Sequence, residues 1–210
     1  MHALPFGRGA RIALFALPIL ALAAVAAIVS SAGGQATPTD SAASARLAIE
    51  QMIKAIQDGN TPIRDRMFFK LRIIGKESVA PLVETLAHAD PRVRDYAAFT
   101  LSFIDDDRAV DPILNLFHND PEISVRAQAA RALGRMEEQR AIDPLIAALK
   151  SDRTEIRQDA AYALGLIGDP RANAALQALE IDPNEVVRFM AKDALARIDR
   201  AVKRKAAEKK

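Results

Sequence analysis

Apolar and polar positions along this chain form a block that recurs about every 31 residues. The blocks align on arginines that each follow a valine or isoleucine, at intervals of 32, 31 and 31 residues: Arg94, Arg126, Arg157 and Arg188. Each of these arginines is followed by an alanine three residues later, a leucine seven residues later and another apolar residue ten residues later. A period of this length with two apolar runs in each unit predicts an array of helical repeats.

The unit from Asp120 to Ser151 shows what one repeat should form. In its first half the apolar residues are spaced four, four and three apart, as on one face of a helix: Val125, Ala129, Leu133 and Met136. After a short polar turn, a second helix should bury Ile142, Leu145 and Leu149. Gly134 and Gly165 share one slot in consecutive units, which predicts a close crossing of neighbouring helices there. A single hairpin would leave one apolar face exposed to water, so the core must form by stacking of neighbouring repeats.

We therefore predict an all-α fold, an α-solenoid (superhelix) of stacked antiparallel helical hairpins. It should contain about four and a half repeats within residues 44–199. An amphipathic capping helix from about Ser44 to Gln57 should come first. The units that follow should begin at Thr61, Asp90, Asp120 and Asp152, and a last helix should run from Asp182 through Ile198. Residues 200–210 form a basic C-terminal tail, expected to fray and then become disordered.

The N-terminal segment has a separate pattern. Two arginines, Arg8 and Arg11, precede the uncharged apolar run 12–29, which small residues follow. This layout predicts that residues 1–32 are a signal peptide or an N-terminal membrane anchor, since the run lies between the usual lengths of the two. Residues 33–43 should form a flexible linker. In either case the repeats should lie outside the cytoplasm, in the periplasm or anchored in the inner membrane.

The repeats resemble the HEAT repeat, in particular the short HEAT-like repeat named after the phycobilisome bilin lyases. The elements that carry the resemblance are an Asp-Pro start, Val-Arg-x-x-Ala-Ala-x-x-Leu-Gly, and then Arg-Ala-Ile-Asp-Pro-Leu-Ile-x-x-Leu, over about residues 61–199. The resemblance implies that second helices line a concave face and first helices a convex one. Arrays of this family serve chiefly as binding scaffolds, whereas the bilin lyases themselves handle a chromophore.

The amino-acid composition excludes some kinds of functional site. The chain has no cysteine, so it offers no disulfide, thiolate metal ligand or cysteine nucleophile. Its net charge of +2 hides an acidic repeat body of about −5 between basic ends, and only 5% of residues are aromatic. An acidic body with few aromatic residues argues against a nucleic-acid partner.

The remaining candidates for chemistry favour structural roles. His88 and His118 should cap the ends of second helices, and Asp105-Asp106-Asp107 should lie in a solvated turn; no metal site and no cofactor is expected. The recurring arginines should reach aspartates at the junctions between repeats. This structural ladder comprises Arg94, Arg126, Arg157 and Arg188 with Asp90, Asp120, Asp152 and Asp182.

The leading functional hypothesis is a non-catalytic scaffold, exported or membrane-tethered, that binds a protein or peptide on its concave face. Residues 12–29 would provide any membrane contact. The expected partner-binding residues lie on second helices away from the core: Glu84, Leu114, Asn115, Ile146, Ala147, Lys150 and Gln177. The alternative is an accessory enzyme or a chromophore- or metal-handling protein related to the bilin lyases.

Overall fold

The computed structural model describes residues 38–104 and 106–208, and this part of the chain forms one compact unit. Within these residues the structure is helical and contains no β-strand, which confirms the all-α prediction. No helix in the described part is long and apolar enough to cross a membrane. The predicted signal peptide or anchor, residues 1–32, lies outside the described residues.

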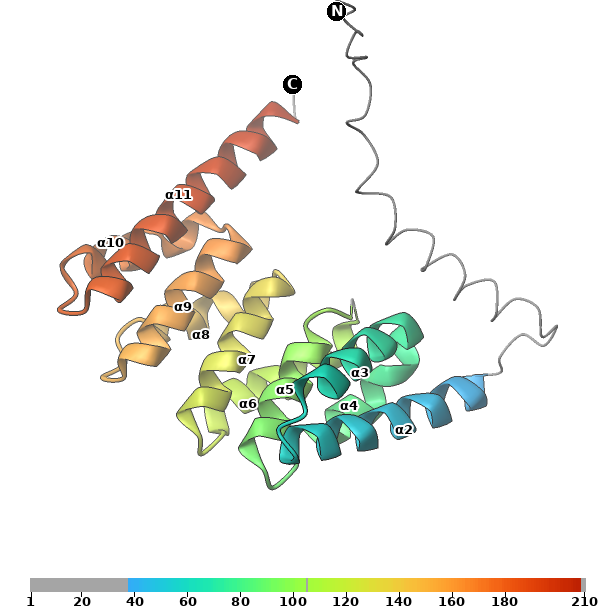
Figure 1. Ribbon diagram of the computed structural model, residues 1–210. Helices are drawn as coiled ribbons and strands as arrows, with labels where there is room; N and C mark the ends of the chain where they lie inside the picture. Colours follow the sequence, from blue (N-terminus) through green and yellow to red (C-terminus); the bar gives the residue numbers. More distant parts are fainter. Residues whose placement is uncertain (1–37, 105, 209–210) are drawn as a thin grey trace, which may run out of the picture. The chain divides into compact units, whose positions relative to one another are not determined.

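Each repeat contains a long first helix and a short second helix (Figure 1). The first helices are α3 (Thr61–Ile74), α5 (Pro91–Leu101), α7 (Ile123–Arg135), α9 (Thr154–Ile167) and α11 (Glu185–Ala207). The second helices are α4 (Val79–Thr85), α6 (Val110–Asn119), α8 (Ile142–Ala148) and α10 (Asn173–Ala178). A 3₁₀ turn precedes each second helix, and one more follows α10: η1 (Gly75–Ser78), η2 (Asp107–Ala109), η3 (Gln139–Ala141), η4 (Pro170–Ala172) and η5 (Leu179–Ile181).

The ends of the array differ from the prediction. The capping helix α2 (Pro38–Gln57) begins before Ser44, so the residues predicted as linker are partly helical. Its alanines favour the helix, and it packs along α3. At the other end α11 continues to Ala207, through most of the predicted tail. Lys203 pairs there with Asp199 at 2.7 Å, one turn earlier, which supports the extra helical turns.

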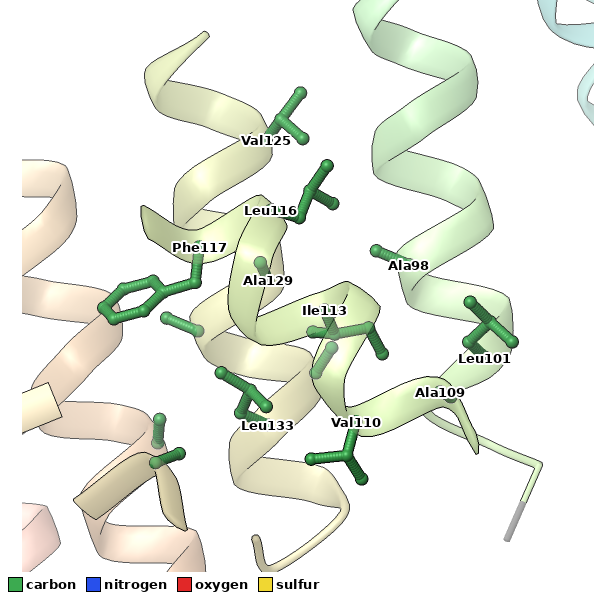
Figure 2. Close-up of a cluster of buried hydrophobic side chains, with 14 of the residues drawn as sticks. Ala98, Leu101, Ala109, Val110, Ile113, Leu116, Phe117, Val125, Ala129 and Leu133 are labelled. Carbon is green, nitrogen blue, oxygen red and sulfur yellow. The ribbon is translucent and has the colours of Figure 1, made fainter. Parts of the chain in front are cut away.

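The core forms where each second helix packs against the first helix of the next repeat. In Figure 2, Ile113 and Leu116 of α6 lie between Leu101 of α5 and the α7 side chains Val125 and Leu133. All five side chains are buried. A hairpin therefore completes its core only with its neighbour, as expected for a solenoid.

Small residues set the spacing of the C-terminal first helices. A Cβ atom at Gly134 would lie 2.6 Å from Cα of Ala163, and one at Gly165 would lie 2.8 Å from Cα of Ala194. These distances leave no room for a side chain, so α7, α9 and α11 cross in close contact. The predicted close crossing is confirmed.

The predicted arginine ladder is present in part, because two of its four arginines pair with predicted aspartates across a junction. Arg94 donates to both carboxylate oxygens of Asp120 at 2.7 and 2.8 Å, and Arg157 does the same to Asp182 at 2.8 and 3.0 Å. The first pair is buried, with side-chain exposures of 10% and 2%. Each pair ties a first helix to the start of the following repeat.

The other predicted ladder members do not pair across repeats. Asp90 caps α5 and pairs with Arg92, while Asp152 is exposed. Asp120 and Asp182 each stand six residues before an aligned arginine, and at the junction between them this position is Ser151. Arg126 therefore has no carboxylate to pair with at that position of the following repeat. Arg126 and Arg188 instead donate to the carbonyl oxygens of those two aspartates at 2.7 and 2.6 Å. The prediction was wrong for these residues because it assumed that all four junction aspartates pair with an arginine in the same way.

We predict that Gly165→Ala lowers the free energy of unfolding by about 1–3 kcal/mol, because the added methyl group must push α9 away from α11. Ala196 is the matched control, since it fills the same slot on α11, where it is exposed. Ala196→Leu should change stability by less than about 0.5 kcal/mol. Urea unfolding of both variants gives the comparison, and equal midpoints would show that the crossing does not limit stability.

We predict that Asp120→Ala costs about 3–5 kcal/mol, because Arg94 is left buried without its partner. Asp152→Ala, at an exposed position, should cost less than about 0.5 kcal/mol. Burial alone would raise the pKa of Asp120, but hydrogen bonds from Arg94 and the Glu122 N–H outweigh it and lower that pKa below its ordinary 3.8. The pair's contribution is therefore complete above pH 3.8 and is lost as the pH falls further. Urea midpoints that are equal for the two variants, or that do not change in acid, would contradict this.

Candidate functional site

A stripe of side chains, here called the outer stripe, runs along one face of the first helices, and its members range from exposed in α3 to buried at Gln128 and Asp159. It occupies the positions two, five and nine residues after each aligned arginine, a spacing that keeps them on one helix face. In α3, aligned on Leu71, the stripe is largely apolar, and in α5 it is aromatic. The members are Arg66, Phe69 and Ile73 of α3; Tyr96 and Phe99 of α5, with Phe103 just past its end; Gln128, Arg131 and Arg135 of α7; Asp159, Tyr162 and Leu166 of α9; and Met190, Asp193 and Arg197 of α11.

Aromatic rings from α3 and α5, with Phe103 just past the end of α5, gather into one group, the aromatic cluster of Phe68, Phe69, Tyr96, Phe99 and Phe103. The Phe68 ring centroid lies 5.2 Å from that of Phe99 and 5.4 Å from that of Phe103. Tyr96 and Phe99 are 5.5 Å apart. The whole sequence has eight phenylalanines and two tyrosines, so half of its aromatic residues meet here.

Two arginines lie over these rings. The Arg72 guanidinium carbon is 5.5 Å from the Phe68 centroid and 5.3 Å from that of Phe103. The Arg135 guanidinium carbon is 5.3 Å from both Phe99 and Phe103. Neither arginine forms a salt bridge with a carboxylate in the described part of the chain. Arg135 donates weakly to the Ser102 hydroxyl at 3.4 Å, and its other donors can bind an anion held at the ring surface. We call the rings and these two cations the aromatic–arginine cluster.

Part of this surface is unusually apolar for an exposed position. Phe69 is 57% exposed, Ile73 is 84% exposed and Phe103 is 38% exposed. Side chains of this size that remain in water beside one another are typical of a binding surface. The half-buried Arg135 differs from the exposed Arg72, because burial lowers its pKa. Pairing with an anion would offset that cost.

A cavity of about 370 Å³ adjoins the cluster near the N-terminal ends of α3, α5 and α7, and Arg64, Asp95, Tyr96 and Ser124 are among its lining residues. Tyr96 donates its hydroxyl to Asp65 at 3.0 Å, and Arg64 also donates to Asp65, at 2.8 Å. Burial, with the hydrogen bond to Asp65, raises the pKa of Tyr96 to about 12. Tyr96 is therefore neutral, and its hydroxyl proton is already donated to Asp65.

Asp95 differs from its neighbours because its carboxylate makes no direct hydrogen bond or ion pair with another described residue. Burial raises its pKa above the ordinary value, although Arg131 and Arg135 of α7 partly oppose the effect. Asp159, nearby on α9, is also buried, but Arg131 donates to both of its oxygens at 3.0 Å. Asp95 is therefore a partly buried acceptor without a protein donor among the described residues, and it lines the cavity.

The residues predicted for partner binding lie elsewhere, on the second helices or just after α8. Glu84 pairs with Arg46 of the capping helix at 2.9 Å, and Asn115 accepts from Asn119 at 2.8 Å. Leu114 and Ile146 are partly buried against the core, which explains their apolar character without a partner. The other three are exposed: Ala147, Lys150 and Gln177. Their role in binding stays a prediction.

The histidines and the acidic turn have local partners. His88 accepts the Asp90 N–H at 3.0 Å, and the His118 ring lies 5.2 Å from that of Phe117. Asp106 accepts from the side chain of Arg108, which lowers the pKa of Asp106 to about 2. Among the described residues, no group of three or more histidine or acidic side chains is placed to hold a metal ion.

The sequence analysis missed the aromatic–arginine cluster. It used the low aromatic content only as evidence against a nucleic-acid partner. The signal that could have found the cluster is the stripe at positions two, five and nine, compared across consecutive repeats.

Comparison with known proteins identifies the repeats. The family model of HEAT repeats matches residues 110–196. The phycocyanobilin lyase subunit alpha of Picosynechococcus sp. is 35% identical over 112 residues, which cover 50% of this chain and 41% of the relative. The chain thus spans about two fifths of the length of this curated relative.

Two solved structures share the fold. The complex of CpcE and CpcF of phycocyanin lyase from Nostoc sp. PCC7120 matches with a TM-score of 0.63 and 22% identity, over 70% of this chain and 98% of the matched chain. Human deoxyhypusine hydroxylase in complex with glycerol matches with a TM-score of 0.51 and 23% identity, over 72% of this chain and 62% of the hydroxylase. At these identities the likeness concerns the fold alone.

The repeats are HEAT-like repeats of the bilin lyase type, and the predicted α-solenoid is confirmed. The leading functional hypothesis of a non-catalytic scaffold is wrong, because the named relative and the first solved structure reported above are lyase subunits. The same matches contradict the prediction that the chain is not an enzyme. The error has a physical source, since the repeat pattern describes the core and carries no information about the outer stripe.

We predict that Asp95→Asn raises the urea midpoint at pH 7. The folded pKa of Asp95 lies above the unfolded one, so the folded state takes up a proton first as the pH falls. Its charged form therefore destabilises the fold, fully above the raised pKa and not at all below pH 3.8. Asp143→Asn, an exposed control, should stay within about 0.5 kcal/mol of wild type. A lower midpoint for Asp95→Asn at pH 7 would mean that Arg131 and Arg135 already stabilise the carboxylate.

Proposed function

We propose that this chain is a subunit of a bilin-lyase-like assembly and handles an open-chain tetrapyrrole such as phycocyanobilin. The carrying observation is its 35% identity over 112 residues to a phycocyanobilin lyase subunit. The aromatic–arginine cluster supplies a surface with the matching chemistry. This proposal takes up the alternative of the sequence analysis.

A tetrapyrrole of this kind is a flat conjugated molecule with two propionate side chains. Its rings can stack on the exposed Phe69, over which no cation lies among the described residues, and such a contact contributes about 0.5–1.5 kcal/mol beyond area burial. Its propionates can accept hydrogen bonds from Arg72 and Arg135, which already lie over the rings. Hydrogen bonds to charged groups contribute about 1.5–3 kcal/mol each. The cluster thus offers both kinds of contact on one face.

The chain would bind and orient the chromophore rather than bond to it through sulfur, since its sequence has no cysteine. Any thiol that accepts the chromophore would belong to another protein. A second subunit fits the similarity to one member of the CpcE–CpcF complex. The exposed second-helix residues Ala147, Lys150 and Gln177 are candidates for that contact.

The location of the repeats outside the cytoplasm also stays a prediction. It rests on Arg8, Arg11 and the apolar run 12–29, all outside the described residues. The intact mass of the protein recovered from its native cells tests it. A full-length chain in the soluble cytoplasm would contradict it.

The proposed function is tested by titrating the full chain with phycocyanobilin and following the absorption spectrum. The wild type should bind, and Arg72→Ala/Arg135→Ala should weaken binding at least tenfold, because the loss of one charged hydrogen bond already suffices for that factor.

The control is Arg140→Ala/Arg171→Ala, which removes the same charge from exposed turns before second helices. It should bind like wild type. If the Nostoc lyase pair binds phycocyanobilin under the same conditions and this chain does not, the proposed function is wrong.

A further inference from the structure

Asp95 occupies the junction between the aromatic–arginine cluster and the adjoining cavity. It precedes Tyr96 of the cluster and is the one carboxylate among the cavity's described lining residues. From Tyr96 to Leu101, the last residue of α5, the helix axis rises about 8 Å at 1.5 Å per residue, and Phe103 follows just beyond. A flat ligand lying along α5 would therefore reach from Arg72 at Phe103, past Arg135 at Phe99, to Asp95.

The surrounding carboxylates are already paired. Asp65 accepts from Arg64 and Tyr96, Asp90 accepts from Arg92, and Asp159 accepts from Arg131. The charged groups that face Asp95 are Arg131 and Arg135 of α7 and Asp159 of α9, and the α3 side chain Arg64 lines the same cavity. None of these cations makes a direct contact with the Asp95 carboxylate. The Asp95 oxygens are not among the buried side-chain atoms that lack a partner, so they stay accessible from the cavity, and a ligand there can supply donors in place of water.

We propose that Asp95 accepts hydrogen bonds from N–H groups of the ligand and thereby selects a nitrogen-rich flat pigment over a flat carboxylate without N–H groups. This inference rests on the proposed function and deepens it. The arginines would hold the ligand's carboxylates, and Asp95 would recognise its pyrrole nitrogens. Of the other polar side chains around the cavity, Arg64 and Tyr96 already donate to Asp65, and Arg92 pairs with Asp90. Thr61 and Ser124 carry no charge. Asp95 is the group that can separate the two ligand classes.

The test compares two probes on the full chain, phycocyanobilin and naphthalene-2,6-dicarboxylate, which is flat and dianionic but has no N–H group. Asp95→Asn should weaken phycocyanobilin binding about tenfold and alter its long-wavelength absorption band, because the pyrrole protons lose a charged acceptor. Binding of the dicarboxylate should be unchanged or tighter, since a negative charge has been removed. Asp143→Asn, on the second-helix side, should leave both probes unaffected.

The outcomes separate the two proposals. If wild type binds phycocyanobilin and Asp95→Asn binds it with the same affinity and spectrum, the inference is overturned while the proposed function stands. If Asp95→Asn weakens both probes equally, Asp95 only shapes the cavity and the inference is overturned. If wild type does not bind phycocyanobilin, both proposals are overturned. A urea midpoint at or above that of wild type verifies that the variant is folded.

Discussion

The contact of Gly134 with Ala163, and of Gly165 with Ala194, sets the distance between first helices, and the rest of the structure depends on that distance. Where backbones meet, α7, α9 and α11 form a tight layer. Towards the N-terminus the small residues disappear, because α3 carries Met67 and Phe68 in the alanine slots. The helices there are held by rings instead of backbone contact. The larger side chains of α3 thus replace close backbone contact with ring contacts, and these rings form the aromatic cluster.

The buried ion pairs act on this layer in a different way. Arg94 with Asp120, and Arg157 with Asp182, connect each first helix to the start of the next repeat. Two hydrogen bonds to one carboxylate fix its orientation as well as its distance, so these pairs limit how neighbouring repeats can rotate. The pairs occur at alternate junctions because Ser151 interrupts the series. At the middle junction Arg126 has no such partner, and the ion pair there joins Arg131 of α7 to Asp159 of α9 at 3.0 Å instead.

Function in such an array belongs to the positions that the core does not use. The alanines, leucines and glycines that recur every 31 residues pack between stacked repeats. Their pattern is therefore the same in a binding scaffold and in a lyase subunit. The outer stripe is free to vary, and here it varies from aromatic in α5 to arginine in α7. Adjacent repeats thus combine rings, cations and the unpaired carboxylate of Asp95 into one surface that no single repeat contains.

The sequence by itself determined the helices, their pairing into repeats and the close crossing at Gly134 and Gly165. These follow from local spacing, since residues three and four apart share a helix face. It did not determine which side chains meet between repeats. The Phe68–Phe99 contact, the placement of Arg135 over Phe103 and the choice of Asp120 rather than Asp90 as the partner of Arg94 depend on the distance and angle between helices. Those quantities arise only when the repeats stack, so the tertiary structure alone decided where the candidate site lies.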